Sequence, residues 1–144
     1  MESIGKIPVR VERDVPGFIG NRLLHALWRE AIWLVQSQIA SAKDVDRVAR
    51  LTFGLRMPAV RPLENMDFVG VDLVHTIHNF LLRELADDHK PQDLLRNRVQ
   101  LGALGMKTGC GFREWTPEEA QEVIERRNRQ IAEQPKFLRE LGEP

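Results

Sequence analysis

The chain has 144 residues, with 21 Lys and Arg against 21 Asp and Glu, 42% hydrophobic and 29% charged residues, which is the profile of one soluble globular domain. The formal net charge of zero gives no long-range attraction to phosphate polymers or anionic lipid, which argues against a nucleic-acid-binding or membrane-surface protein. A domain of this size normally buries roughly two thirds of the surface that its unfolded chain exposes, so we expect a core that needs no disulfide or metal.

The single cysteine and the hydropathy pattern bear on location. Cys110 is the only cysteine, so the chain cannot form an internal disulfide, which is typical of a reducing compartment. The longest stretch free of Asp, Glu, Lys and Arg covers residues 31–42, well short of the ~20 apolar residues that span a bilayer. Glu2 follows Met1, and no basic and then apolar secretory leader is visible. We therefore expect a cytoplasmic protein without a membrane segment.

The first twelve residues differ in pattern from the rest of the chain. Residues 7–12 alternate with a period of two, which predicts a half-buried strand over Pro8 to Glu12, at a sheet edge because Pro8 lacks an N–H. A lone strand cannot satisfy its own backbone hydrogen bonds. We expect this strand to pair with something outside the helical body, as in a chain cut from a longer one or built to receive a partner.

Helical spacing begins after residues 14–17 and continues along the chain. Apolar residues on several faces of the first helix, with Trp28 and Trp33 among them, predict a central helix that is contacted from more than one side. Ser41 is the expected N-cap of the second helix, and Gly54 is expected to stop that helix. The expected helices cover residues 18–37, 42–53, 63–69, 71–85 and 92–101.

A glycine-rich loop and one further helix follow. Four glycines lie between Gly102 and Gly111, which predicts a loop with several positive-φ residues. The loop lacks the pattern of a phosphate-binding loop and no hydrophobic strand precedes it, so we interpret it as a structural turn. Thr116 as N-cap, followed by a proline and two glutamates, predicts a final helix over residues 117–134 with a largely solvated face.

Few side chains form a recognisable catalytic pattern. His75 and His78 lie three apart on one helix, with His89 and Cys110 elsewhere, but a metal site needs at least three converging ligands. We interpret the histidines as core or surface residues. Cys110 has no base beside it in a motif that would activate its thiol. Glutamates surround the basic residues at 126–129, which predicts a solvated helix face.

Asn21 is a more informative polar residue. It lies at the start of the central helix, directly after residues 16–20. Its amide could cap a free N–H of that helix, or it could point outward and orient a carbonyl or hydroxyl group. On residue chemistry alone the capping role is favoured, because asparagine is a preferred N-cap residue.

Four segments, taken in order, carry a resemblance to a known family. Residues 16–22 read Pro-Gly-Phe-Ile-Gly-Asn-Arg, and residues 39–46 read Ile-Ala-Ser-Ala-Lys-Asp-Val-Asp. Residues 62–72 read Pro-Leu-Glu-Asn-Met-Asp-Phe-Val-Gly-Val-Asp, and residues 105–112 read Gly-Met-Lys-Thr-Gly-Cys-Gly-Phe. These segments resemble four collinear motifs of the 3-hydroxyacyl-CoA dehydrogenase family. Because four motifs in one order are more specific than any one of them, the resemblance extends over residues 5–115.

The resemblance implies an all-α fold, a helical bundle of the 6-phosphogluconate-dehydrogenase C-terminal-like type, preceded by one short β-strand left from a Rossmann domain. The implied divisions are a Rossmann remnant over residues 1–15, the C-terminal helical domain over residues 16–116 and a helical extension over residues 117–144. In the family, the N-terminal domain binds NAD and supplies the catalytic histidine, while the C-terminal domain closes over the acyl-CoA and forms the dimer. By resemblance, Asn21 is the asparagine that contacts the substrate oxygen.

The chain departs from the family pattern at four positions. Gly20 replaces a usual valine, Gln38 and Arg61 replace usual glycines, and Arg113 replaces the tyrosine of the last motif. Gly20 should loosen the first turn of the central helix, at roughly 1 kcal/mol of helix propensity against alanine. Gln38 should carry a steric cost of similar order if it adopts the positive φ of a helix-ending glycine.

The leading hypothesis is the substrate-binding and dimerisation domain of an NAD-dependent 3-hydroxyacyl-CoA dehydrogenase-like oxidoreductase of fatty acid metabolism. No residue offers a cofactor fold, a positioned base or a metal site, so the chain alone should not turn over, and NAD would be held by an absent or separate Rossmann domain. The expected partners are a second copy, that domain, and an acyl-CoA or other small hydroxy substrate. The alternative is a non-enzymatic helical dimer or interaction module from the same family, which the apolar central helix also favours.

Overall fold

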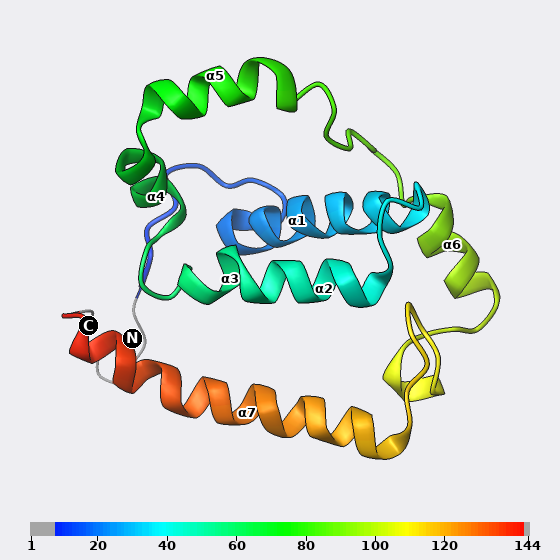
Figure 1. Ribbon diagram of the computed structural model, residues 1–144. Coiled ribbons are helices and arrows are strands. Elements are labelled where there is room, and N and C mark those ends of the chain that lie inside the picture. Colours follow the sequence, from blue (N-terminus) through cyan, green and yellow to red (C-terminus); the bar gives the residue numbers. More distant parts are fainter. Residues whose placement is uncertain (1–7, 143–144) are drawn as a thin grey trace.

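The structure is a computed structural model that describes residues 8–142, and it is helical over most of that range (Figure 1). The all-α fold expected from the sequence is confirmed. In chain order the elements are α1 (Phe18–Gln36), α2 (Ala42–Leu51), α3 (Phe53–Arg56), α4 (Pro62–Val69), α5 (Val71–Leu81), α6 (Asp93–Gln100), the 3-10 turn η2 (Met106–Thr108) and α7 (Pro117–Glu140).

Two helix starts follow from local capping, as the sequence predicts. The Ser41 hydroxyl accepts a hydrogen bond of 3.1 Å from the backbone N–H of Asp44 and so caps α2. At the start of α7, the Thr116 hydroxyl accepts from the N–H of Glu119, and the Glu119 carboxylate accepts from the N–H of Thr116. Hydrogen bonds from its own backbone N–H and from Thr116 also lower the pKa of Glu118 below its usual value.

The strand expected at Pro8 to Glu12 does not form. Residues 8–11 have no regular secondary structure and are exposed, and Ile7 lies outside the described residues. A strand is defined by the backbone hydrogen bonds to a neighbouring strand, and residues 8–142 hold only isolated bridges in the glycine-rich loop. The alternating residues 8–12 have no neighbouring strand among residues 8–142 to bond with, so they remain irregular.

Some helix ends differ from the expected ones. The second helix ends at Leu51, and Gly54 lies inside α3 instead of stopping α2. A Cβ on Gly54 would lie 2.5 Å from the Ala49 carbonyl oxygen, so this glycine allows α3 to approach the end of α2. The long helix of residues 71–85 ends as α5 at Leu81. The expected end of the last helix at residue 134 is wrong: α7 continues through Pro135 to Glu140, although a proline inside a helix removes one hydrogen bond and its ring crowds the carbonyl four residues before it.

The helices do not enclose a core of their own. α1 packs closely against α2 and α6, α2 against α3, and α4 against α5. In Figure 1, α5 and α7 lie on opposite sides of the layer formed by α1, α2 and α3. Among residues 8–142 only Ala86, Gln92 and Gly111 are buried, whereas large side chains such as Phe68 and Phe80 are 82% and 61% exposed.

The exposed surface is far larger than the mass of the chain predicts. The chain exposes 12191 Å². A folded monomer of 16.6 kDa would expose about 7,600 Å². The expectation of a self-contained core is therefore wrong for this chain, because the scaling with mass applies to monomers whose elements cover one another.

One segment ties the second half of the chain to α1. The backbone N–H of Ala86 donates to the Glu30 carboxylate at 2.8 Å, and the Gln92 amide donates to the Arg29 carbonyl oxygen at 2.9 Å. The N–H of Leu94, in the first turn of α6, donates to the Gln36 amide oxygen at 2.8 Å. The intervening residues 87–91 are exposed, as the sequence predicts for a solvated loop.

No helix within residues 8–142 combines the length and the apolar character needed to cross a bilayer.

Replacing Gln38 by glycine tests the strain at the end of α1. Gln38 has a φ of 58°, as expected if it takes the place of a helix-ending glycine. Gln38→Gly should raise the free energy of unfolding by about 1 kcal/mol, since glycine adopts this conformation without a Cβ clash. Urea denaturation at a fixed protein concentration measures the effect. The control is Ser37→Gly, at a φ of −80°, which should destabilise; equal losses in both variants would contradict the strain.

Candidate functional site

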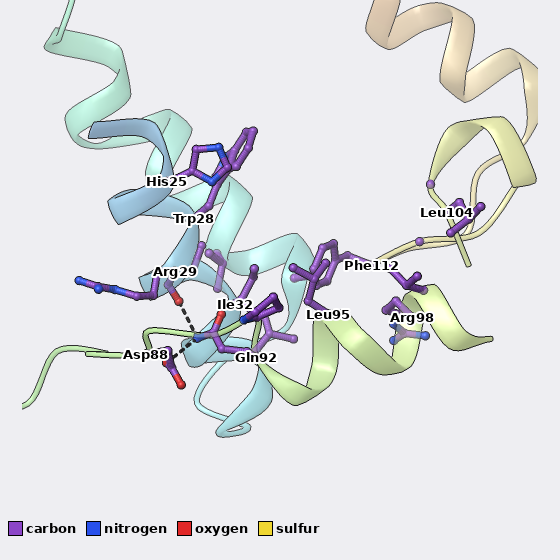
Figure 2. A pocket seen from close by; sticks show the side chains of 18 of the residues that line it. His25, Trp28, Arg29, Ile32, Asp88, Gln92, Leu95, Arg98, Leu104 and Phe112 are labelled. Carbon is purple, nitrogen blue, oxygen red and sulfur yellow. Dashed lines mark hydrogen bonds between the residues drawn. The ribbon is translucent and has the colours of Figure 1, made fainter. Parts of the chain in front are cut away.

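A wide cavity of about 1420 Å³ lies along one face of α1. Its walls come from the turn before α1, the start of α2, residues 88–92, α6 and the glycine-rich loop at residues 103–115. Figure 2 shows Ile32 of α1, Leu95 of α6 and Phe112 of the loop converging on it from three elements. These three contributors are far apart in the sequence, so the cavity depends on the tertiary arrangement.

Asn21 lies on the wall of this cavity and does not cap α1. The N-cap is Gly17, with φ 84°, and no side chain bonds to the free N–H groups of the first turn. The capping interpretation of Asn21 is therefore wrong: Asn21 lies one turn into the helix. Its amide makes no hydrogen bond to any residue in the range 8–142, and it lines the cavity. Its donor and acceptor are therefore available to another molecule.

The turn before α1 holds the backbone in an unusual conformation. Gly17 and Phe18 both have positive φ, 84° and 48°, and the N–H of Phe18 donates to the Val15 carbonyl oxygen at 3.0 Å. A positive φ at phenylalanine is sterically costly, and such strain is concentrated at functional sites in proteins. A Cβ on Gly17 would lie 3.4 Å from Cγ of Arg22. The motif glycine thus permits the tight entry into α1 that places Asn21.

His25 follows Asn21 by one helical turn and also lines the cavity. Its ring packs edge-on against Trp28, with centroids 4.9 Å apart and an angle of 73° between the ring planes (Figure 2). No carboxylate among the described residues orients the imidazole. A general base normally needs an orienting partner, so this geometry does not assemble a positioned base at His25.

Gln92 is a site residue that the sequence reasoning missed. Its amide is buried and donates to the Arg29 carbonyl oxygen and, at 3.1 Å, to the Asp88 carboxylate (Figure 2). These bonds fix the segment that forms one cavity wall. No local signal marks Gln92 in the sequence, because both partners depend on how the chain returns to α1.

Two arginines bring positive charge to the cavity wall. Nε of Arg98 has no contact with solvent and no hydrogen-bond partner within residues 8–142. The Arg113 guanidinium lies 4.3 Å above the Trp115 ring and 3.6 Å from the Asp46 carboxylate. The guanidinium of Arg113 thus joins the glycine-rich loop to Asp46 of α2.

The glycine-rich loop closes on itself. The N–H of Gly105 donates to the Cys110 carbonyl oxygen at 2.7 Å, and the N–H of Gly111 donates to the Arg113 carbonyl oxygen at 2.8 Å. A Cβ on Gly111 would lie 2.8 Å from Cα of Gly105, so two strands of the loop touch through their glycines. The positive φ values at residues 102, 105 and 109 agree with the prediction of a structural turn.

The described residues do not fit NAD. A dinucleotide site places a glycine-rich turn between a strand and a helix, with free N–H groups toward the pyrophosphate. This loop follows α6, and the N–H groups of Gly105 and Gly111 are bound to its own carbonyl oxygens. These residues therefore supply no binding site for NAD.

The other candidate residues do not come together. His75 and His78 lie on α5, His89 lies in the loop before α6, and Cys110 lies in the glycine-rich loop. Within residues 8–142, no three His, Cys, Asp or Glu side chains are grouped so that they could hold a metal ion. The basic residues 126–129 are exposed on α7.

A family model described as "3-hydroxyacyl-CoA dehydrogenase, C-terminal domain" matches residues 17–115, which include Asn21, α1 to α6 and the glycine-rich loop. The chain belongs to the 3-hydroxyacyl-CoA dehydrogenase family. The match covers the family's C-terminal domain, as the four collinear motifs indicate.

Similar proteins include members with different substrates. The 5-formyl-3-hydroxy-2-methylpyridine 4-carboxylate 5-dehydrogenase of Mesorhizobium japonicum is 30% identical over 131 residues, which are 91% of this chain and 42% of that protein. A probable 3-hydroxybutyryl-CoA dehydrogenase of Deinococcus radiodurans is 39% identical over 112 residues, which are 77% of this chain and 39% of that protein. The chain thus spans about two fifths of the length of these two proteins.

A solved structure has the same open arrangement. The crystal structure of 5-formyl-3-hydroxy-2-methylpyridine 4-carboxylic acid 5-dehydrogenase, described as an NAD⁺-dependent dismutase, matches with a TM-score of 0.91 and 29% identity. The match covers 99% of this chain and 46% of that chain. This longer dehydrogenase thus holds these helices in nearly the same relative positions while it carries more than twice the length.

Two glycine substitutions, three residues apart in the motif at residues 16–22, should have opposite effects. Gly17→Ala should lower the free energy of unfolding by about 1–2 kcal/mol, because alanine resists a φ of 84°. Gly20→Ala should raise it by about 0.5–1 kcal/mol, since a Cβ there meets no atom within 4 Å and alanine favours the helix. Urea denaturation of both variants at one protein concentration is the measurement. A stable Gly17→Ala variant would contradict the role of the left-handed turn.

Proposed function

We propose that this chain is the substrate-binding and dimerisation domain of a 3-hydroxyacyl-CoA dehydrogenase-like oxidoreductase. The observation that carries the proposal is the match of residues 17–115 to the family's C-terminal domain together with the position of Asn21, unpartnered on the cavity wall. In this role the Asn21 amide donates to the substrate oxygen and holds it in place. The left-handed turn at Gly17 and Phe18 sets the position of that amide.

The cofactor belongs to another domain in this proposal. The chain spans about two fifths of its relatives, and the described residues offer neither a dinucleotide turn nor a positioned base. NAD would supply hydride transfer from a separate Rossmann domain, and the chain alone would have no activity. The division into residues 1–15, 16–116 and 117–144 and the cytoplasmic location are parts of the same proposal.

The substrate class follows from the relatives only in outline. Their names include 3-hydroxybutyryl-CoA dehydrogenase and a dehydrogenase of a hydroxylated pyridine carboxylate. The apolar cavity wall at Ile32, Leu95 and Phe112, with Arg98 and Arg113 beside it, suits an organic anion of either type.

Dimerisation is supported by the exposed surface. The chain exposes about 4,600 Å² more than a monomer of its mass. If two copies covered half of that excess on each chain, they would bury about 4,600 Å² in total, within the range of about 2,000–5,000 Å² of obligate homodimers. Apolar side chains make up much of this surface, with Leu23, Leu55 and Phe68 more than half exposed.

A second candidate function is a non-enzymatic assembly module of the same family. The exposed apolar surface favours an assembly module as much as an enzyme domain, because such a surface indicates association with another molecule and not a particular reaction. The two functions differ at Asn21, which matters for turnover and not for association.

Substitution of Asn21 separates the two functions. The chain is produced together with the N-terminal half of the Deinococcus radiodurans relative, and NADH oxidation with acetoacetyl-CoA is followed. Asn21→Ala should lower kcat/KM by about 100-fold, the usual loss when one oxyanion donor is removed. Asn97→Ala, on an exposed face of α6 outside the cavity lining, is the matched control and should keep the activity.

NADH oxidation by the chain alone, without a cofactor domain, would overturn the proposal that NAD is bound by a separate domain. Equal activity of the Asn21→Ala and Asn97→Ala variants would favour the assembly module.

The oligomeric state tests the second half of the proposal. The chain should sediment as a dimer from about 1 to 100 μM, and its unfolding midpoint should rise with protein concentration, because association binds only the folded state. A monomer at 100 μM with a midpoint independent of concentration would refute dimerisation.

A further inference from the structure

Within residues 8–142, helix α7 packs closely against no other helix. It lies outside the family match at residues 17–115, and it is not one of the helices that pack closely with a neighbour. Figure 1 shows it as a separate arm beyond the layer of α1, α2 and α3. Every side-chain hydrogen bond and ion pair of residues 117–140 joins two residues of the helix or its cap. In proteins, most of the stability of a helix comes from the packing of its amphipathic face, and the described residues supply little such packing for α7.

One side of α7 carries an apolar stripe that Arg127 and Gln134 interrupt. Ala120, Val123, Ile124, Ile131 and Leu138 recur at the spacing that places residues on one side of a helix. Ile131 is 63% exposed and Ile124 is 40% exposed. A helix of 24 residues is about 36 Å long, so this stripe is long enough to serve as a helix-packing surface.

The charges of α7 divide into two halves of opposite sign. Residues 117–125 hold four glutamates and no Lys or Arg, whereas residues 126–140 hold four arginines and one lysine against two glutamates. The first half therefore carries a formal charge of −4, and the second half a formal charge of +3. A rod with this distribution is complementary to itself when it is turned end to end, as a two-fold axis requires of the two halves of an isologous interface.

We propose that α7 packs antiparallel against α7 of a second copy of this chain, stripe against stripe, with the acidic half of each helix beside the basic half of the other. The inference rests on the dimerisation proposed above and assigns part of its interface to residues 117–140. The excess of exposed surface calls for a large contact. The longer chain of the matched crystal structure keeps the open arrangement over 99% of this chain, so its additional residues do not draw α7 onto α1, α2 and α3.

The arrangement also makes the cavity wall depend on the second copy. Trp115, which lines the cavity under the Arg113 guanidinium, is separated from the first residue of α7 only by Thr116. A second copy that holds α7 therefore fixes one end of the glycine-rich loop, while the Arg113 to Asp46 ion pair fixes the loop to α2.

Charge reversal tests the pairing. The first variant carries Glu118→Lys, Glu122→Lys and Glu125→Lys, so both halves of α7 become basic. The second carries Arg126→Glu, Arg129→Glu and Arg139→Glu, so both halves become acidic. Lys, Arg and Glu have similar helix propensities, and circular dichroism confirms that each variant keeps its helix content.

Each variant alone should dimerise at least about tenfold more weakly than the unchanged chain in sedimentation equilibrium, and an equimolar mixture should recover dimers that contain one chain of each kind. The weakening should diminish at 1 M NaCl, where the Debye length is about 3 Å. Recovery in the mixture is specific to α7 facing α7. Weak dimers that the mixture does not rescue would mean that α7 docks on another element of the second copy, which overturns the antiparallel pairing.

A substitution pair tests the stripe independently of charge. Ile131→Gln should weaken the dimer at least about tenfold, whereas Ala132→Gln, one residue further and off the stripe, should leave the dissociation constant within about twofold. Undiminished association in all α7 variants, with the unchanged chain dimeric, would refute the inference while dimerisation stands. A monomeric unchanged chain would refute dimerisation itself.

Discussion

The hydrogen bonds between α1 and residues 86–94 are the constraint on which the second half of the structure depends. Glu30 and Gln36 accept from the backbone N–H groups of Ala86 and Leu94, and buried Gln92 donates to the Arg29 carbonyl oxygen. Because a buried amide without a partner costs about 1–3 kcal/mol, this segment has one favourable position on α1. α6 and the glycine-rich loop follow from it, and the cavity lies between them and Asn21.

The same chain combines a well-defined cavity wall with a fold that does not cover itself. Local geometry is specified by caps, glycines and short hydrogen bonds, none of which needs a core. The burial that normally stabilises a domain is missing, because Ala86 is the only buried hydrophobic side chain among residues 8–142. Folding stability and association are therefore linked in this chain, and a measurement of either depends on protein concentration.

The sequence predicted what short-range rules decide. Ser41 and Thr116 cap helices because the hydroxyl and the N–H it accepts from are three residues apart. The positive φ of Gln38 could be predicted because the resemblance places a glycine there. The family was recognisable from four motifs, and the match to residues 17–115 confirms it.

The sequence did not predict what distant segments decide. Gly54 looked like a helix stop, but it lies inside α3, where the turn between α2 and α3 would bring an added Cβ within 2.5 Å of the Ala49 carbonyl oxygen. Gln92 carried no signal because its partners lie in α1 and the preceding loop. The alternating residues at Pro8 to Glu12 suggested a strand that needs a neighbour these residues lack. The prediction of a self-contained core was wrong because the relation between mass and exposed surface applies to chains whose elements cover one another.

The contact between Gly105 and Gly111 has a consequence for variation in this loop. With only 2.8 Å available to a Cβ at position 111, any other residue there would push the two arms of the loop apart and carry Phe112 and Arg113 with them. Space alone therefore fixes the residue at position 111, whereas Arg113, two residues further, acts through its side chain on Trp115 and Asp46. A substitution at position 113 therefore alters the charge of the cavity wall, whereas a substitution at position 111 alters the path of the backbone that forms it.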